Sequence, residues 1–249
     1  MMDDKDIEDY HNIGKAIKKN SKYNYVDGKQ IEDHGSRIYD VAGYRLPSVT
    51  TILGKTKNQQ FLKEWKAKVG EKEAERIKNL SSVRGTAMHK YLECYIDGTG
   101  HKDLTSIGKE AEPMARKIIE SGLGDLEEVW GQEVTLYYPG LYAGATDIVG
   151  IYEGKPAIID FKQTNKPKKR EWISDYFCQL GAYCMAHNYV YGTKIQSGVI
   201  LMCSKDLLFQ KFEVAGREFV RHQHEFLRKV DQYYKIVPQK KEGQGTKNG

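Results

Sequence analysis

The second half of the chain alternates short apolar runs with turn residues, a pattern that predicts β-strands. The segment YAGATDIVGIYEGKPAIIDFK, residues 142–162, contains two such runs joined by a turn with Gly154 and Pro156. Further strands are predicted at residues 129–138, 198–203 and 207–214. Shorter runs near the start predict strands at residues 23–26, 37–41 and 44–46, the last two as a hairpin across Ala42-Gly43.

Apolar side chains recur at helical spacing between and around these strands. Ser48 is a candidate N-cap for a helix or helical turn over residues 48–53, and Ser81-Ser82 for a helix that runs to about residue 96. Helices are also predicted at residues 58–80, 106–121, 172–189 and 217–236. This order predicts an α/β fold, with a small mixed sheet flanked by helices and with an N-terminal hairpin and helical additions.

Length and composition favour one elaborated domain. The chain has 249 residues, of which 39% are hydrophobic, enough for one substantial core. We expect a single domain over residues 21–237, with the hairpin and helices in 21–128 and the catalytic core in 129–237. The charged residues 1–20 predict a flexible arm, and residues 238–249 predict a disordered tail.

The charge balance permits a polyanionic partner without identifying one. Lys and Arg number 39 and Asp and Glu 34, which gives a net charge of +5. No apolar run approaches the length of a membrane span, and the acidic start of the chain is unlike a secretory signal. We therefore expect a soluble intracellular protein that has no membrane partner.

The cysteines form no CxxC pair and no Cys/His quartet at zinc spacing. In an intracellular chain of this size, this favours buried free thiols over disulfides, and we expect no iron–sulfur cluster. The cysteines are Cys94, Cys178, Cys184 and Cys203. His222 and His224 point apart on a helix, which favours a solvated face over a metal site.

Charged side chains stand at the end of a strand that otherwise reads as buried. Asp160 and Lys162 occupy alternate positions and share one face, whereas Phe161 points to the other. Asp147 lies in the preceding strand among small and apolar residues. Buried carboxylates need a partner, and two that converge offer oxygen ligands for Mg²⁺ or Mn²⁺. A lysine beside them suits phosphodiester hydrolysis, although a structural ion pair with Lys162 would explain the same residues.

Basic and aromatic residues follow this cluster in the segment NKPKKREW. Such a run is usually a solvated loop, but beside a phosphate-cleaving centre it is suited to hold a nucleic-acid backbone while aromatic rings stack bases. The predicted contacts are Lys166, Lys168, Lys169, Arg170, Trp172 and Tyr176. His89 on a predicted helix fits either packing or a site, and Glu133 is either a third acid or a strand-end charge.

Four short motifs occur along the chain in one order, and together they are far more specific than any one of them. They are Gly85-x3-His89, Gly144-x2-Asp147, Asp160-x-Lys162 and Gln179-x3-Tyr183. This set resembles the motifs of RecB-like nucleases of the PD-(D/E)xK superfamily, and most of all the mitochondrial genome maintenance exonucleases with their phage and bacterial relatives. The likeness covers roughly residues 46–237, including the segments PSVTTIL and IIDFKQTNKPK.

The resemblance implies a PD-(D/E)xK core and a Mg²⁺- or Mn²⁺-dependent DNA exonuclease that prefers single-stranded ends, acting in replication, recombination or repair. Lys162 would serve the attacking water and the transition state, supported by Gln179 and Tyr183, and Arg84 joins the predicted DNA contacts. The implied metal ligands are His89, Asp147, Asp160 and the backbone carbonyl of Phe161, with Glu133 as a weaker match.

Other functions share the same residues. A restriction-type or structure-specific endonuclease would use the same chemistry, and a non-catalytic nucleic-acid-binding module would keep the fold alone. Three ionisable groups at the ends of buried strands favour an enzyme over a binding module. Because a mitochondrial leader is missing from the acidic start, the expected location is the cytoplasm of a bacterial or phage-infected cell, and the expected state is a monomer.

Overall fold

A computed structural model describes residues 17–33 and 35–237. Its centre is a six-stranded mixed sheet in the order β1-β5-β6-β7-β8-β9, with parallel pairs at β1–β5 and β7–β8 and antiparallel pairs elsewhere. The strands are β1 Lys18–Lys19, β5 Leu126–Tyr138, β6 Tyr142–Tyr152, β7 Lys155–Thr164, β8 Ser197–Ser204 and β9 Phe209–Ala215. This confirms the predicted mixed α/β architecture.

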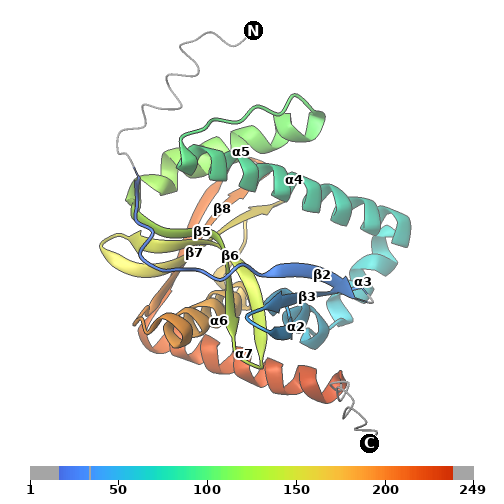
Figure 1. The fold of residues 1–249 in the computed structure, drawn as a ribbon. Helices are drawn as coiled ribbons and strands as arrows, with labels where there is room; N and C mark the ends of the chain where they lie inside the picture. Colours follow the sequence, from blue (N-terminus) through green and yellow to red (C-terminus); the bar gives the residue numbers. More distant parts are fainter. Residues whose placement is uncertain (1–16, 34, 238–249) are drawn as a thin grey trace, which may run out of the picture.

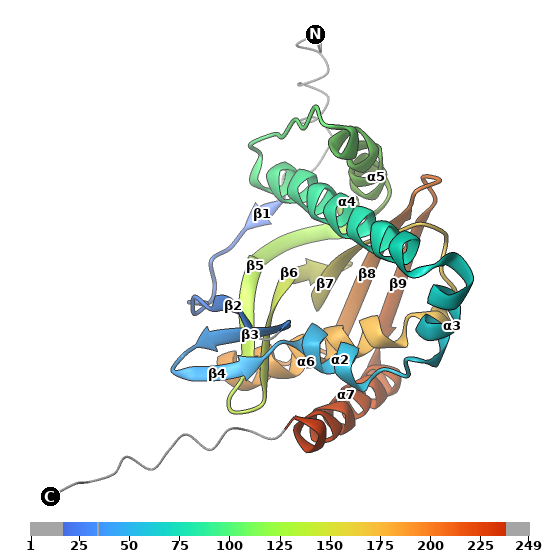
Figure 2. The same ribbon diagram turned by 90° about the vertical axis from the view of Figure 1, so that its right-hand side faces the viewer.

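Helices cover both faces of the sheet (Figures 1 and 2). One face carries α4 and α5, and the other carries α2, α6 and α7. The helices are α2 Val49–Thr56, α3 Gln60–Val69, α4 Glu71–Asp97, α5 Ser106–Gly122, α6 Ser174–Tyr191 and α7 Gly216–Ile236, with short 3₁₀ turns at Leu123–Asp125 and Arg170–Trp172. Among the described residues, no helix is long and apolar enough to cross a bilayer.

Alternation along β7 builds both cores at once. Ile159 and Phe161 pack under α4 and α5, whereas Ile158 packs toward α6 and α7. Asp160 shares the parity of Ile158 and therefore belongs to the α6 side. Since α6 connects β7 to the parallel strand β8, its start lies next to the end of β7.

The N-terminal hairpin forms as predicted, within a second sheet of three strands. The sheet comprises β2 Lys29–Asp33, β3 Ser36–Val41 and β4 Tyr44–Pro47. Positive φ angles of 51° at Ala42 and 79° at Gly43 make the tight turn between β3 and β4. Ser48 caps α2, because its side chain accepts a hydrogen bond from the Thr51 amide at 2.9 Å.

The helix boundary predicted at Ser81-Ser82 is wrong. The break lies at Gly70, whose φ of 85° ends α3, and α4 then runs without interruption from Glu71 to Asp97. Only glycine adopts such a backbone angle at little cost, whereas a serine is tolerated inside a long helix. The two predicted helices over residues 58–80 and 81–96 are thus divided eleven residues earlier than expected.

Two other predictions near the N-terminus need correction. Residues 23–26 are not a strand; instead the rings of Tyr23 and Tyr25 pack against His187 at centroid distances of 5.0 and 5.8 Å. Lys18 and Lys19, within the predicted flexible arm, form β1 and pair in parallel with β5. The rest of that arm, residues 1–16, and the predicted tail, residues 238–249, lie outside the described residues.

Candidate active site

The central feature of the site is a place where two neighbouring strands part. The β6–β7 ladder ends at the pair Ile148–Ile159, so the next two residues, Asp147 and Asp160, face each other without a backbone pairing. The Asp147 carboxylate replaces the missing partner, because its Oδ2 accepts a hydrogen bond from the Phe161 amide at 2.6 Å. Both aspartates are buried. The strands therefore open at their ends around two carboxylates.

His89 reaches this opening from α4. Its Nε2 lies 2.9 Å from the Phe161 carbonyl oxygen, and its Nδ1 lies 3.4 Å from Asp147 Oδ1. The His89 ring thus lies between the Phe161 carbonyl and the Asp147 carboxylate, the two groups that the family resemblance implies as metal ligands together with His89. Both ring nitrogens of His89 therefore have polar neighbours.

Glu133 joins the same cluster from β5. It falls between the pairs Gln132–Ile148 and Val134–Thr146 and so lies opposite Asp147. Its φ of 51° is unusual for a residue with a side chain. Ligand atoms of His89, Glu133 and Asp147 all lie within 4.8 Å of one another. Of the two interpretations of Glu133, the third acid is the one that this geometry favours.

Lys162 occupies the α6 side of the opening. Its Nζ forms an ion pair with Asp160 Oδ2 and lies 5.1 Å from the centre of the Tyr176 ring. Behind it, Gln179 Nε2 donates to the Tyr183 hydroxyl at 3.4 Å, and both side chains are buried. Gln179 and Tyr183, one turn apart on α6, therefore place two buried polar groups on the α6 side of the opening.

Gly144 explains why the second motif begins with glycine. A Cβ atom at this position would lie 2.8 Å from the Tyr183 hydroxyl oxygen and 2.9 Å from a ring carbon. These distances are shorter than van der Waals contact, so any side chain on Gly144 would displace Tyr183. The glycine lets the Tyr183 ring lie directly on the backbone of β6.

Charges in the opening hold one another in place. Burial disfavours the imidazolium, but the attraction of Asp147 outweighs burial and raises the pKa of His89 to about 9. Burial acts to raise the pKa of Asp147, whereas His89 and Lys162 bring it below its usual value. For Asp160, burial and repulsion from Asp147 raise the pKa to about 6 despite the adjacent Lys162. The cations His89 and Lys162 therefore offset the burial of Asp147, but they do not fully offset the burial and repulsion of Asp160.

The pKa of Glu133 is raised further than that of Asp160. Partial burial of its carboxyl group, with the neighbouring carboxylates of Asp147 and Glu93, raises its pKa to about 8, although the residue as a whole is exposed. Carboxylate oxygens, a carbonyl oxygen and one imidazole form a donor set that suits Mg²⁺ or Mn²⁺. A divalent cation would relieve the repulsion, so the residues present fit the metal that the sequence predicts.

Some basic side chains of the loop after β7 are exposed, and others are partly buried beside protein partners. Lys166 and Lys169 are exposed, and Lys169 Nζ lies 5.3 Å from the centre of the exposed Trp172 ring. Arg170, in contrast, pairs with Glu218 of α7 at 2.8 Å and donates to the Glu213 carbonyl. Lys168 is half-buried beside Gln210, which bonds its backbone. Arg170 thus has a structural partner that sequence did not indicate.

Arg84 differs most from its predicted role in DNA contact. Its side chain is only 5% exposed, and its guanidinium donates to Gln163 at 3.0 Å, to Glu110 at 3.2 Å and to Asn165. These partners tie α4 to the end of β7 and to α5. Arg84 is therefore an internal link that fixes the helix carrying His89, and it presents no open face to a phosphate.

We expect Arg84→Met to lower the free energy of unfolding by about 1–3 kcal/mol, because hydrogen bonds from a buried guanidinium are lost. Arg76→Met is the matched control: Arg76 lies on the same helix and pairs with Glu73, but both side chains are open to solvent, and such pairs contribute little to stability. Urea unfolding of both variants measures the difference. Equal losses would show that the Arg84 contacts add nothing to stability.

His222 and the cysteines were predicted from spacing alone, with mixed success. All four cysteines are buried and free, as expected. His222 is buried, not solvated, and contacts Cys178 and Glu225, whereas His224 is exposed. The i,i+3 spacing of His222 and Glu225 was visible in the sequence, but Cys178 comes from another helix, and only the α6–α7 packing brings it near.

Comparisons with known proteins give related sequences. No family model matches the chain. It is 31% identical over 174 residues to mitochondrial genome maintenance exonuclease 1 of Mus musculus, and 31% identical over 181 residues to the protein of the same name from Homo sapiens. Each alignment covers 65% of this chain and 50% of the relative, so the chain spans about half the length of these relatives.

Among solved structures, a protein from Eubacterium rectale described as a candidate exonuclease aligns over 63% of this chain and 65% of its own, with 16% identity and a TM-score of 0.47. In sequence, the chain is similar to the two relatives named mitochondrial genome maintenance exonuclease 1.

Proposed function

We propose that this protein is a metal-dependent deoxyribonuclease with a PD-(D/E)xK core, which hydrolyses phosphodiester bonds from the ends of single-stranded DNA. Its main support is the opening of the β6–β7 ladder around Asp147 and Asp160, with Lys162 and His89 at its two sides. The names of the sequence relatives add a second, independent support. We also propose that the protein acts as a monomer in the cytoplasm of a bacterial or phage-infected cell.

The residues divide the chemistry between them. Asp147, Asp160, His89 and the Phe161 carbonyl would hold Mg²⁺ or Mn²⁺, which supplies Lewis-acid activation of a water and of the scissile phosphate. Lys162 would orient that water through its ammonium group and balance charge that develops on the phosphate oxygens. Gln179 and Tyr183 keep the lysine side of the opening polar and ordered.

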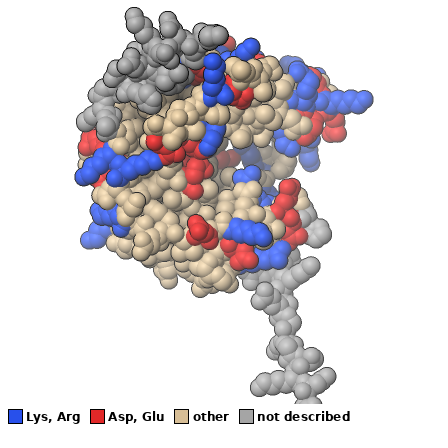
Figure 3. Space-filling model, turned by 45° about the horizontal axis from the view of Figure 1, so that its top comes forward, with Lys and Arg blue, Asp and Glu red and all other residues tan. Residues whose placement is uncertain are grey.

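Preference for a single strand is proposed from the surroundings of the site. The space-filling view shows a hollow on the side where α3 and the start of α4 project, with both basic and acidic side chains near its rim (Figure 3). Exposed Lys166, Lys169 and Trp172 follow β7 beside the site. Cations and an exposed indole suit a flexible strand whose bases are free to stack, and binding should weaken steeply with salt.

A digestion panel tests the function. Linear and circular forms of one single-stranded DNA, and the matching duplex, are incubated with Mg²⁺, Mn²⁺ or EDTA. We expect progressive shortening of the linear single strand with either metal, none in EDTA, and survival of the circle. Cutting of the circle at a comparable rate would identify an endonuclease, and metal-independent binding without cleavage would identify a binding module.

A further inference from the structure

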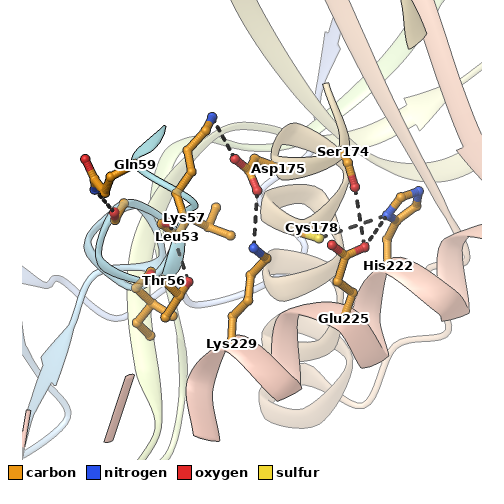
Figure 4. Close-up of polar contacts among 12 residues, drawn as sticks. Leu53, Thr56, Lys57, Gln59, Ser174, Asp175, Cys178, His222, Glu225 and Lys229 are labelled. Atoms are coloured by element: carbon orange, nitrogen blue, oxygen red, sulfur yellow. Dashed lines mark hydrogen bonds and ion pairs between the residues drawn. The ribbon is translucent and has the colours of Figure 1, made fainter. Parts of the chain in front are cut away.

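A second group of metal-binding side chains lies between α6 and α7, on the far side of α6 from the candidate active site. Figure 4 shows Cys178 of α6 and His222 and Glu225 of α7 pointing toward one another. One ligand atom from each residue lies within 4.8 Å of the other two. Cys178 is fully buried, and His222 is 8% exposed. Thiol, imidazole and carboxyl groups therefore converge in the packed interface of two helices.

The distances among these groups are long for hydrogen bonds. His222 Nδ1 lies 4.0 Å from Cys178 Sγ and 3.4 Å from Glu225 Oε2, and Ser174 Oγ lies 3.4 Å from the same carboxylate oxygen. Strong hydrogen bonds to oxygen are about 2.7–3.2 Å. Donors around a tetrahedral Zn²⁺ stand roughly 3.3–3.8 Å apart, given bonds of about 2.0 Å to nitrogen and 2.3 Å to sulfur. The His222–Glu225 distance falls within this range, and the Cys178–His222 distance exceeds it by about 0.2 Å, so the three donors lie close to the spacing of a zinc site.

A nucleophilic triad is a poor explanation for the same residues. In such a triad, one ring nitrogen faces the nucleophile and the other faces the carboxylate. Here Cys178 and Glu225 both approach Nδ1 of His222. In addition, Cys178 is fully buried and no substrate could reach its sulfur.

The lysines near this cluster pair with another carboxylate, Asp175. Asp175, three residues before Cys178, is held by two lysines: Oδ2 lies 2.9 Å from Lys57 Nζ, and Oδ1 lies 3.6 Å from Lys229 Nζ (Figure 4). Glu225 is 33% exposed at its side chain, which gives an ion a path from solvent and a fourth position for water. A thiolate and a carboxylate together balance a 2+ charge.

We infer that Cys178, His222 and Glu225 form a structural site for a thiophilic divalent cation, with Zn²⁺ as the best match. Sulfur and nitrogen donors select Zn²⁺ over Mg²⁺, in contrast to the oxygen-rich candidate active site. The ion would fasten α7 to α6 at the residue next to Gln179. Its role is to stabilise the fold, so the site does not depend on the proposed nuclease activity.

Cobalt provides a spectroscopic test on the full chain. Co²⁺ is added in the presence of excess Mg²⁺, which competes for the oxygen-rich cluster, and the near-ultraviolet thiolate-to-cobalt charge-transfer band is recorded. We expect the band in wild type, its loss in Cys178→Ser, and its retention in Cys184→Ser, a matched variant of another buried thiol on α6. A wild-type protein without the band, or one whose band survives in Cys178→Ser, would overturn the inference.

Thermal unfolding gives a second readout that does not need a cysteine variant. Zinc at on the order of a hundred times its Kd should raise the Tm of wild type by about 5 °C or more. In His222→Gln, which keeps the buried thiol, the shift should disappear, whereas in His224→Gln, on the exposed side of α7, it should persist. Equal shifts in wild type and His222→Gln would mean that the ion binds elsewhere. This variant decides the matter if Cys178→Ser fails to fold.

Discussion

Asp160→Asn should lower metal-dependent DNA cleavage by on the order of a thousandfold or more, which corresponds to several kcal/mol of transition-state stabilisation. Asp160 is buried at the point where β6 and β7 part, and it forms the ion pair with Lys162. An amide of the same shape carries no charge for a divalent cation. Single-turnover cleavage of linear single-stranded DNA at saturating Mn²⁺ measures the loss.

A fold control accompanies this variant, because replacing Asp160 leaves the half-buried Lys162 with fewer partners. An isolated buried charge costs several kcal/mol, whereas removal of both members of a pair is often neutral. The double variant Asp160→Asn/Lys162→Met should therefore recover stability that Asp160→Asn loses, as measured by urea unfolding, and stay inactive. Appreciable Mn²⁺-dependent cleavage by the single variant would remove Asp160 from the mechanism.

Lys162→Met should lower cleavage by on the order of 10²–10³-fold while metal binding persists, since the loss of one preorganised charge at a developing anion has effects of this size. Metal affinity should hold or improve, because the ammonium group that competes with the cation for Asp160 is gone. Calorimetry with Mn²⁺ separates binding from turnover.

Lys166→Met is the matched control for the same change of charge at an exposed position of the following loop. It should weaken DNA binding at moderate salt and leave single-turnover cleavage at saturating DNA nearly unchanged. Loss of metal binding in Lys162→Met, or equal loss of turnover in both variants, would contradict a chemical role for Lys162.

Elements whose boundaries depend on local signals were well predicted from the sequence. The Ala42-Gly43 turn, the Ser48 cap and the strands around Asp147 and Asp160 follow from turn residues, capping and alternation, which act over a few neighbouring residues. The start of α4 was not predicted, because serines suggested a cap where the surrounding helix formers continue and Gly70 makes the break.

The residues that sequence misjudged depend on partners far away in the chain. Arg84 looks like a surface cation until Gln163 and Asn165, about 80 positions later, surround its guanidinium. His222 looks solvated until α6 brings Cys178 beside it. Local pattern carries no information on such contacts, so the buried polar links of the fold emerge only from its packing.

Because α4 is continuous from Glu71 to Asp97, the number of residues between Arg84 and His89 fixes where the His89 side chain lies relative to Arg84. Arg84 anchors the helix to the end of β7, and His89 meets the Phe161 carbonyl on the same strand. One inserted residue between them would turn the imidazole by about 100° and advance it by about 1.5 Å, out of reach of that oxygen. A loop would absorb such an insertion. Evolution can therefore vary an exposed side chain of this segment, such as Thr86, more freely than the length of the segment.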